Sequence, residues 1–189
     1  MKKISYFLLA MILALVVFPS GQAFATNYPG TSVTMTPGDV LSSPKSWSST
    51  KFLGHVAIVG PKNEVIHSHP VEDRVVVESV SSFASRHAST DVIEIYRAKS
   101  SSAATTAASW AYNNASKSTN YSLTAGYYDI VNNYCSKWVW QAFYLSSAKY
   151  DLVFGTQMDR DISDGLGVPI TPSGLKSSSK LTKVGSFKR

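Results

Sequence analysis

The sequence predicts a single α+β domain built around a small antiparallel sheet. Four short runs rich in β-branched residues come first along the chain, and two helical patterns follow them. The β-rich runs occupy residues 56–59, 65–67, 75–80 and 92–97. With 189 residues, 44% of them hydrophobic, the chain is large enough for one core without disulfide or metal staples. Its 16% charged and 12% aromatic residues exclude a disordered tail or a coiled coil.

The first 25 residues predict a secretory signal peptide. Two lysines precede an apolar run at residues 4–18, and a small-x-small pattern follows at residues 23–25. The run is shorter than the ~20 residues of a membrane span, which disfavours the alternative of an uncleaved anchor. No cysteine follows closely, which excludes a lipoprotein. We therefore expect cleavage after Ala25, one mature domain over residues 26–189, and a secreted, extracytoplasmic or wall-associated protein.

The charge is basic and unevenly placed. Loss of Lys2 and Lys3 lowers the formal net charge from +6 to +4, and no acidic residue follows Asp164. The basic residues of the C-terminal tail are Lys176, Lys180, Lys183, Lys188 and Arg189. The tail is interpreted either as a solvated, partly frayed end or as a contact for an anionic wall polymer or membrane surface. Nucleic acid is not an expected partner, and the oligomeric state is left open.

The remaining elements follow from local signals. Residues 36–39 form a turn that enters a strand at residues 40–41, and residues 42–51 look like a loop. Serines begin an alanine-rich helix at residues 101–115, and two asparagines precede an apolar helical face at residues 134–145. Residues beyond 151 give no clear pattern.

Cys135 is the sole cysteine and falls in the first turn of the second predicted helix. A lone cysteine excludes an internal disulfide framework and every multi-cysteine metal motif. At a helix N-terminus, free N–H groups and the helix dipole stabilise a thiolate and lower the pKa of the thiol. The alternative is a buried thiol that acts as a small hydrophobic side chain. Position alone leaves both interpretations open.

Two of the four histidines fall on neighbouring predicted strands. If Val59 pairs with Asn63 across the hairpin, His55 and His67 lie opposite each other on one face, with Cβ atoms ~5 Å apart. A loop longer by two residues keeps them on the same face. The alternatives are satisfied structural histidines, or a zinc site formed with His69. No cofactor is expected.

Four motifs together identify a family resemblance. They occur in the order Gly38-Asp39-Val40-Leu41, Gly54-His55-Val56-Ala57-Ile58-Val59, Val65-Ile66-His67 and Tyr134-Cys135-Ser136-x-x-Val139. The set resembles the circularly permuted papain-like amidase family (YiiX/YaeF-like), which is related to NlpC-type cell-wall peptidases and to lecithin retinol acyltransferase. The similarity spans residues 37–145. It implies a permuted papain-like domain with a barrel-like sheet packed on helices and a nucleophile at a helix N-terminus.

The resemblance also implies a role for each site residue. Cys135 is the expected nucleophile, His55 the general base and acid, and His67 the group that orients His55. The chain departs from the family in having histidine at position 67, where YiiX-like members usually have glutamate and acyltransferase relatives have histidine. Lys137 and Trp138 replace a usual Glu-Leu pair, and we expect this change to alter only the rim of the cleft.

The expected function is therefore that of an exported thiol hydrolase that cleaves an amide in a cell-envelope substrate, such as a peptidoglycan peptide. Two alternatives stay open: a hydrolase or transferase acting on lipid acyl esters, and a wall-binding module without turnover. Tyr134 is expected beside the cleft, and Asp39 is expected to hold the first strand without a catalytic role.

Overall fold

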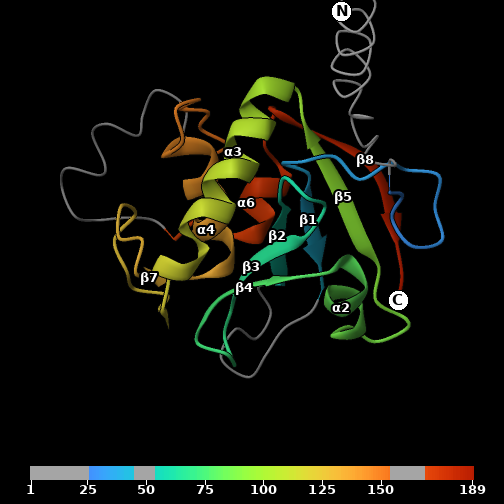
Figure 1. Cartoon of the computed structure of the whole chain (residues 1–189), viewed down its shortest axis with the longest axis horizontal. Coiled ribbons are helices and arrows are strands. Elements are labelled where there is room, and N and C mark those ends of the chain that lie inside the picture. The colour runs from blue at the N-terminus through green and yellow to red at the C-terminus, as the bar shows by residue number, and fades with distance from the viewer. Residues whose placement is uncertain (1–25, 45–53, 154–168) are drawn as a thin grey trace, which may run out of the picture.

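A six-stranded antiparallel sheet forms the centre of the computed structural model, which describes residues 26–44, 54–153 and 169–189 (Figure 1). The strand order across the sheet is β4-β3-β2-β1-β5-β8. The strands are β1 (Val40–Ser43), β2 (His55–Val59), β3 (Val65–His69), β4 (Arg74–Glu78), β5 (Ile93–Ala98) and β8 (Leu181–Phe187). This sheet, packed on helices, confirms the α+β prediction at the level of architecture. The predicted signal peptide lies outside the described residues.

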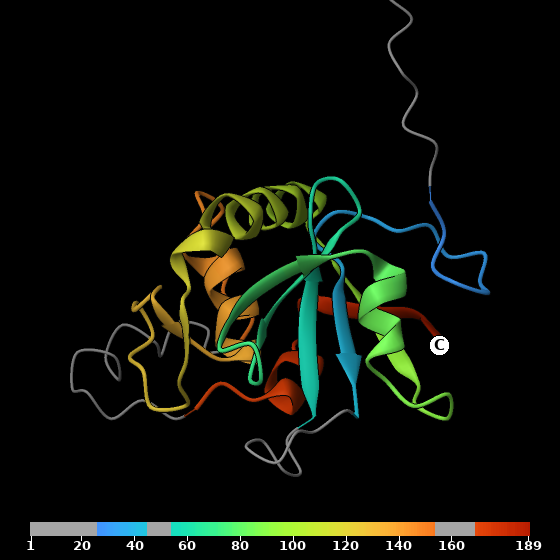
Figure 2. The same cartoon turned by 60° about the horizontal axis from the view of Figure 1, so that its bottom comes forward.

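The helices cover both faces of the sheet. They are α2 (Val80–Ser85), α3 (Ser101–Asn114), α4 (Cys135–Tyr144) and α6 (Pro172–Lys176), with a 3₁₀ turn η1 at Ala115–Lys117. Helices α3 and α4 lie on one side of the sheet, and α2 lies on the other (Figure 2). No helix of the described segments is long and apolar enough to cross a membrane.

Strand β2 contributes to two hydrophobic cores because its side chains alternate between the two faces. Val56 and Ile58 belong to the core that contains α4, whereas Ala57 and Val59 belong to the core around Phe83 of α2. All five residues of β2 are therefore buried. This double burial fixes the position of His55 at the start of the strand.

The hairpin between β2 and β3 differs from the predicted pairing. Val59 pairs with Val65, so the loop comprises residues 60–64 and is two residues longer than the three-residue loop assumed from the sequence. Because the change is even, His55 and His67 still share one face of the sheet, as expected. They are offset along the strands and do not lie directly opposite each other.

Several elements were missed or misplaced by the sequence patterns. Strand β1 continues through Ser43, into the predicted loop, and α2, α6 and β8 were not predicted. The prediction of a frayed C-terminal tail is wrong because β8 pairs with β5 along its length. Lys176 and Lys183 each form an ion pair of 2.6 Å with Glu94. Contact of this tail with an anionic polymer stays a prediction.

Asp39 holds the first strand, as expected from its turn position. Its buried carboxylate accepts hydrogen bonds from the Tyr28 hydroxyl at 2.9 Å and from the Thr36 N–H at 3.1 Å. Arg97 of β5 donates two more bonds to it, at 2.8 and 2.7 Å. The preceding Gly38 has φ +85° and lies against the backbone of Ala104, where a Cβ atom would clash. The motif is thus structural.

Candidate active site

Cys135 is the first residue of α4, and only 4% of its surface is exposed. Tyr134 is the N-cap, with extended backbone at φ −138° and no side-chain capping bond. The asparagines expected near the cap form instead the short strand β7 (Asn132–Asn133), which pairs in parallel with β6 (Asn120–Tyr121). Tyr134 lies beside the cleft, as predicted, and its hydroxyl accepts a hydrogen bond of 3.1 Å from the Ile170 N–H.

The thiol of Cys135 rests in its neutral form. Burial raises its pKa, and the Val56 N–H, Ser136 and the Tyr121 hydroxyl offset only part of that rise. The sequence-based expectation of a lowered pKa is therefore wrong for the resting protein. Loss of solvent around the sulfur outweighs the favourable helix N-terminus.

His55 and His67 form a direct hydrogen bond of 2.8 Å between Nε2 of His55 and Nδ1 of His67. Their rings meet edge to face with centroids 4.9 Å apart. Burial lowers the pKa of both imidazoles, which keeps them neutral at neutral pH.

The structure does not bring these histidines to the thiol. His55 shares the sheet face of Ala57 and Val59, with its ring centroid 6.2 Å from that of Phe83, whereas Cys135 lies in the core on the α4 face. The Val56 N–H that faces the thiol belongs to the residue directly after His55. A hydrogen bond between the thiol and an imidazole is absent from those found among the described residues. The pairing of Cys135 with His55 therefore stays a prediction from the motifs.

The zinc alternative does not fit the directions of the ring nitrogens. His55 and His67 bond to each other, and Nε2 of His67 faces Glu78 at 2.9 Å. Nε2 of His69 lies 3.0 Å from the guanidinium of Arg86, whose charge opposes a cation. Within the described ranges, no group of three or more His, Cys, Asp or Glu side chains is arranged to hold a metal ion.

An apolar pocket of about 310 Å³ adjoins Cys135. Its other lining residues are Gly54, Tyr121, Leu123, Tyr134, Ser136, Pro169, Ile170, Thr171 and Pro172. None of these described lining residues carries a charged side chain. Leu123 lies at the solvent side, with 42% of its surface exposed.

Tyr121 is a site residue that the sequence patterns did not single out. Its buried hydroxyl interacts with the Cys135 thiol and has no other hydrogen-bond partner within the described part of the chain. Burial and the neighbouring thiol in turn raise the pKa of Tyr121 above its ordinary value. Only the parallel pairing of Tyr121 with Asn133 brings this ring to Cys135, and local sequence patterns do not encode that contact.

The residues that replace the usual Glu-Leu pair lie inside the protein, so the expectation of a change at the rim is wrong. Lys137 is fully buried, and its Nζ donates to the carbonyl oxygens of Asp129 at 2.7 Å and Asn132 at 2.6 Å. Burial lowers the pKa of Lys137 to about 8. Trp138 belongs to the core. These residues support the loop that leads into α4.

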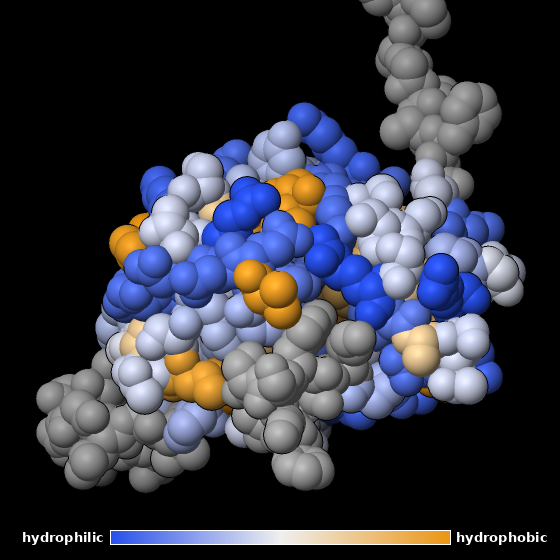
Figure 3. Space-filling model, turned by 90° about the horizontal axis from the view of Figure 1, so that it is seen from below, coloured by the Kyte–Doolittle hydropathy of each residue, from blue (hydrophilic) through white to orange (hydrophobic). Residues whose placement is uncertain are grey.

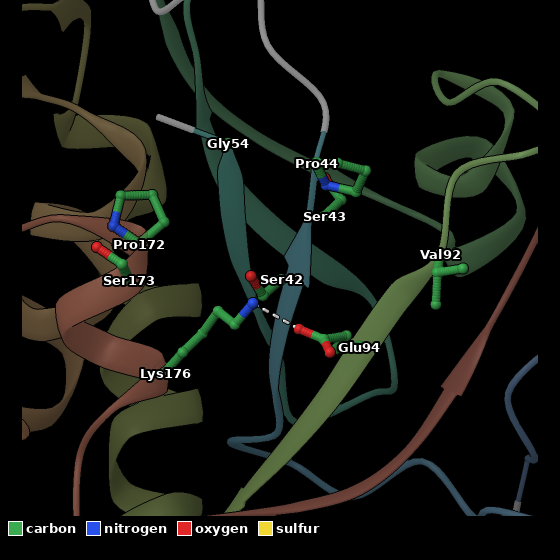
Figure 4. Close-up of a pocket in the computed structure, with 9 residues that line it drawn as sticks. All are labelled: Ser42, Ser43, Pro44, Gly54, Val92, Glu94, Pro172, Ser173 and Lys176. Carbon is green, nitrogen blue, oxygen red and sulfur yellow. Dashed lines mark ion pairs between the residues drawn. The ribbon is translucent and has the colours of Figure 1, made fainter. Parts of the chain in front are cut away.

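A second, more polar pocket of about 500 Å³ lies beside the first and shares Gly54 and Pro172 with it (Figure 4). The ion pair between Lys176 and Glu94 crosses it. On the outer surface seen in Figure 3, hydrophobic residues form small separate patches within a largely hydrophilic face.

The comparisons with known proteins agree with this fold. The sequence model of the family described as "Lipoprotein N-acylation protein LnsA-like" matches residues 1–155. The fold is similar to the crystal structure of "metalloprotein yiiX" from Escherichia coli O157:H7, with a TM-score of 0.56 and 14% identity. That similarity covers 82% of this chain and 98% of the other, and it supports the YiiX-like resemblance seen in the motifs. No curated protein matches the sequence. The chain belongs to the LnsA-like lipoprotein N-acylation protein family.

Proposed function

We propose that this protein is an extracytoplasmic thiol enzyme that transfers or hydrolyses an acyl group carried by a lipid ester. The observation that carries the proposal is the pocket at Cys135, whose described lining offers an acyl chain an apolar surface and includes no charged side chain. A peptidoglycan peptide, the first substrate expected from the sequence, brings charged groups for which the described lining holds no charged partner. The family description, which concerns acylation, favours the same choice.

In the first half-reaction, Cys135 is the nucleophile and His55 the base. As Sγ attacks the ester carbonyl, His55 takes the thiol proton, so that the neutral resting pair forms charge only during attack. The N–H of Cys135 and the hydroxyl of Tyr121 donate hydrogen bonds to the developing oxyanion. The ester C–O bond then breaks, the alcohol leaves with the proton from His55, and the acyl group remains on Cys135 as a thioester.

In the second half-reaction, water or an amine attacks the thioester. His55 takes a proton from the attacking group, the C–S bond breaks, and the proton returns to the sulfur. The products are a carboxylic acid with water, or an amide with an amine. His67 orients His55 throughout.

Acyl p-nitrophenyl esters of increasing chain length test the proposal directly. Burial of each methylene contributes ~0.8 kcal/mol, so kcat/KM should rise about fourfold per methylene until the pocket is full. Intact-mass spectrometry should show one acyl adduct on Cys135, and Cys135→Ala should remove both adduct and turnover. Equal rates for all chain lengths, or turnover that survives Cys135→Ala, would overturn the proposal. Peptide stem amides serve as the competing substrate class.

A further inference from the structure

We propose that Glu78 is a positioning residue of this site, which fixes the tautomers of His67 and, through it, of His55. The consequence for turnover rests on the proposed function. The tautomers themselves are a property of the resting protein and can be measured without a substrate.

Glu78 lies on the same sheet face as the two histidines. It pairs with Val65 across β3 and β4, and His67 is the next residue of β3 on that face. Oε1 of Glu78 lies 2.9 Å from Nε2 of His67. The two side chains are almost completely buried, with 7% and 0% of their surfaces exposed, so solvent does not compete for this contact.

Two further side chains keep Glu78 ionised and fixed. Nε of Arg86 donates to both carboxylate oxygens, at 2.8 and 3.1 Å, and the Ser82 hydroxyl donates at 2.5 Å. Burial would raise the pKa of Glu78, but the hydrogen bonds from His67, Arg86 and Ser82 outweigh it and lower the pKa to about 2. The carboxylate is therefore an acceptor only.

The donor and the acceptor are therefore fixed in each hydrogen bond from His55 through His67 to Glu78. Because Glu78 only accepts, Nε2 of His67 carries the proton and donates to it. Nδ1 of neutral His67 therefore carries a lone pair and accepts the hydrogen bond from Nε2–H of His55 across 2.8 Å. Since His55 is also neutral, its remaining lone pair is on Nδ1. Under the proposed function, Nδ1 is the nitrogen that takes the thiol proton.

The same chain places a negative charge behind the base. When His55 gains a proton during attack, its Nε2–H bond to His67 strengthens, and the carboxylate polarises His67 from the far side. Burial limits screening by solvent, but the Arg86 guanidinium pairs with the carboxylate, offsets part of its charge and, in addition to burial, lowers the pKa of His55. Glu78 thus affects the rate without contact with substrate.

Three variants separate the effect of the hydrogen bond that Glu78 accepts from the effect of its charge. Glu78→Leu removes the acceptor, Glu78→Gln keeps Oε1 as an acceptor without the charge, and Glu72→Gln is the control. Glu72 bonds to the same Arg86 at 2.8 Å but does not contact His67. Long-range ¹H–¹⁵N correlation spectra of the imidazoles report which nitrogen is protonated. Circular dichroism checks that each variant is folded.

We expect the wild type and Glu72→Gln to show His67 protonated at Nε2 and His55 at Nε2. Glu78→Gln should keep these tautomers, and Glu78→Leu should give a mixture. A wild-type His67 protonated at Nδ1, or unchanged tautomers in folded Glu78→Leu, would overturn the proposal. If Glu78→Leu does not fold, the wild-type and Glu78→Gln spectra still decide it.

Ester turnover gives an independent test. In a serine protease, the carboxylate that orients the catalytic histidine contributes ~10⁴ in kcat. Glu78 lies one hydrogen bond further from the base, so we expect Glu78→Leu to lower kcat about 10- to 100-fold and to change KM little. Glu72→Gln should retain the wild-type rate. If Cys135→Ala does not abolish turnover, the proposed function fails, whereas the tautomers decide the role of Glu78 separately.

Discussion

The thiol of Cys135 lies against the backbone N–H of Val56, the residue that follows His55. Helix α4 and strand β2 come from distant parts of the sequence, and their packing brings Cys135 to the start of β2. The site therefore depends on a helix–sheet contact and not on a local motif.

The resting state of the thiol is measurable from its alkylation by iodoacetamide. Because burial raises the pKa of Cys135, the rate should increase with pH and reach half its maximum above the ~8.5 of a free cysteine. The urea-unfolded protein serves as the control and should return to the ordinary value. A folded-state midpoint well below 8.5 would instead indicate a resting thiolate–imidazolium pair.

Loss of the Tyr121 hydroxyl should slow turnover without weakening the fold. Its hydroxyl interacts with the Cys135 thiol and has no other partner among the described residues, so Tyr121→Phe removes only that contact from the resting protein. Removal of one oxyanion donor typically lowers kcat ~10²–10³-fold. The half-exposed Tyr128, changed to phenylalanine, is the matched control and should keep wild-type activity. Equal rates for the two variants would remove Tyr121 from the mechanism.

A charge at the mouth of the apolar pocket should weaken the preference for long acyl chains. Leu123 lines the pocket and is exposed, so Leu123→Asp adds a charge with little cost to folding. We expect kcat/KM for decanoyl esters to fall at least tenfold, because a loss of ~1.4 kcal/mol of apolar contact energy corresponds to a factor of ten. We expect kcat/KM for acetyl esters to change little. Val71→Asp, at an exposed valine outside the pocket, is the control. A uniform loss across chain lengths would argue against acyl binding there.

Asp39 should matter for stability and not for chemistry. Asp39→Ala leaves the Arg97 guanidinium and Tyr28 hydroxyl without their acceptor. Removal of one partner of a buried pair costs ~3–5 kcal/mol, and we expect about 3 here because Arg97 is partly exposed. Urea denaturation measures this loss, with Asp91→Asn as control, because Asp91 is partly exposed and asparagine keeps an oxygen that can accept from the Ala88 N–H. Activity per folded molecule should stay unchanged, and a selective loss of activity would return Asp39 to the site.

The buried histidines should make the fold sensitive to acid. Burial lowers the pKa of His55 and His67, and it lowers the pKa of His69 to about 4. Below pH ~6.5, these histidines therefore bind protons in the unfolded chain that they do not bind in the folded chain. Their contribution is complete above pH ~6.5 and is lost as the pH falls, by up to ~1.4 kcal/mol per histidine and pH unit. Urea unfolding at pH 7.5 and pH 5 measures it. Equal stability at both values would show that these rings are not held neutral.

The sequence patterns located what local signals encode. The β-rich runs, the cysteine at a helix start and the even spacing that keeps His55 and His67 on one face all follow from periodicity. The parts that depend on distant packing were missed: Tyr121 reaches Cys135 only through a two-residue parallel pairing. Glu78 reaches His67 only because β4 lies beside β3. The direction of the pKa shift of Cys135 was also missed, because it depends on the burial of the thiol, which no short motif specifies.

Lys137 and Gln141 of α4 hold the loop before the cysteine through its carbonyl oxygens, at residues 127, 129 and 132. Every amino acid carries that oxygen, so side chains in this loop can be exchanged without loss of these bonds. These bonds fix the path of the loop into α4 without specifying the side chains at residues 127, 129 and 132. The position of Cys135 is therefore compatible with sequence change at these three positions.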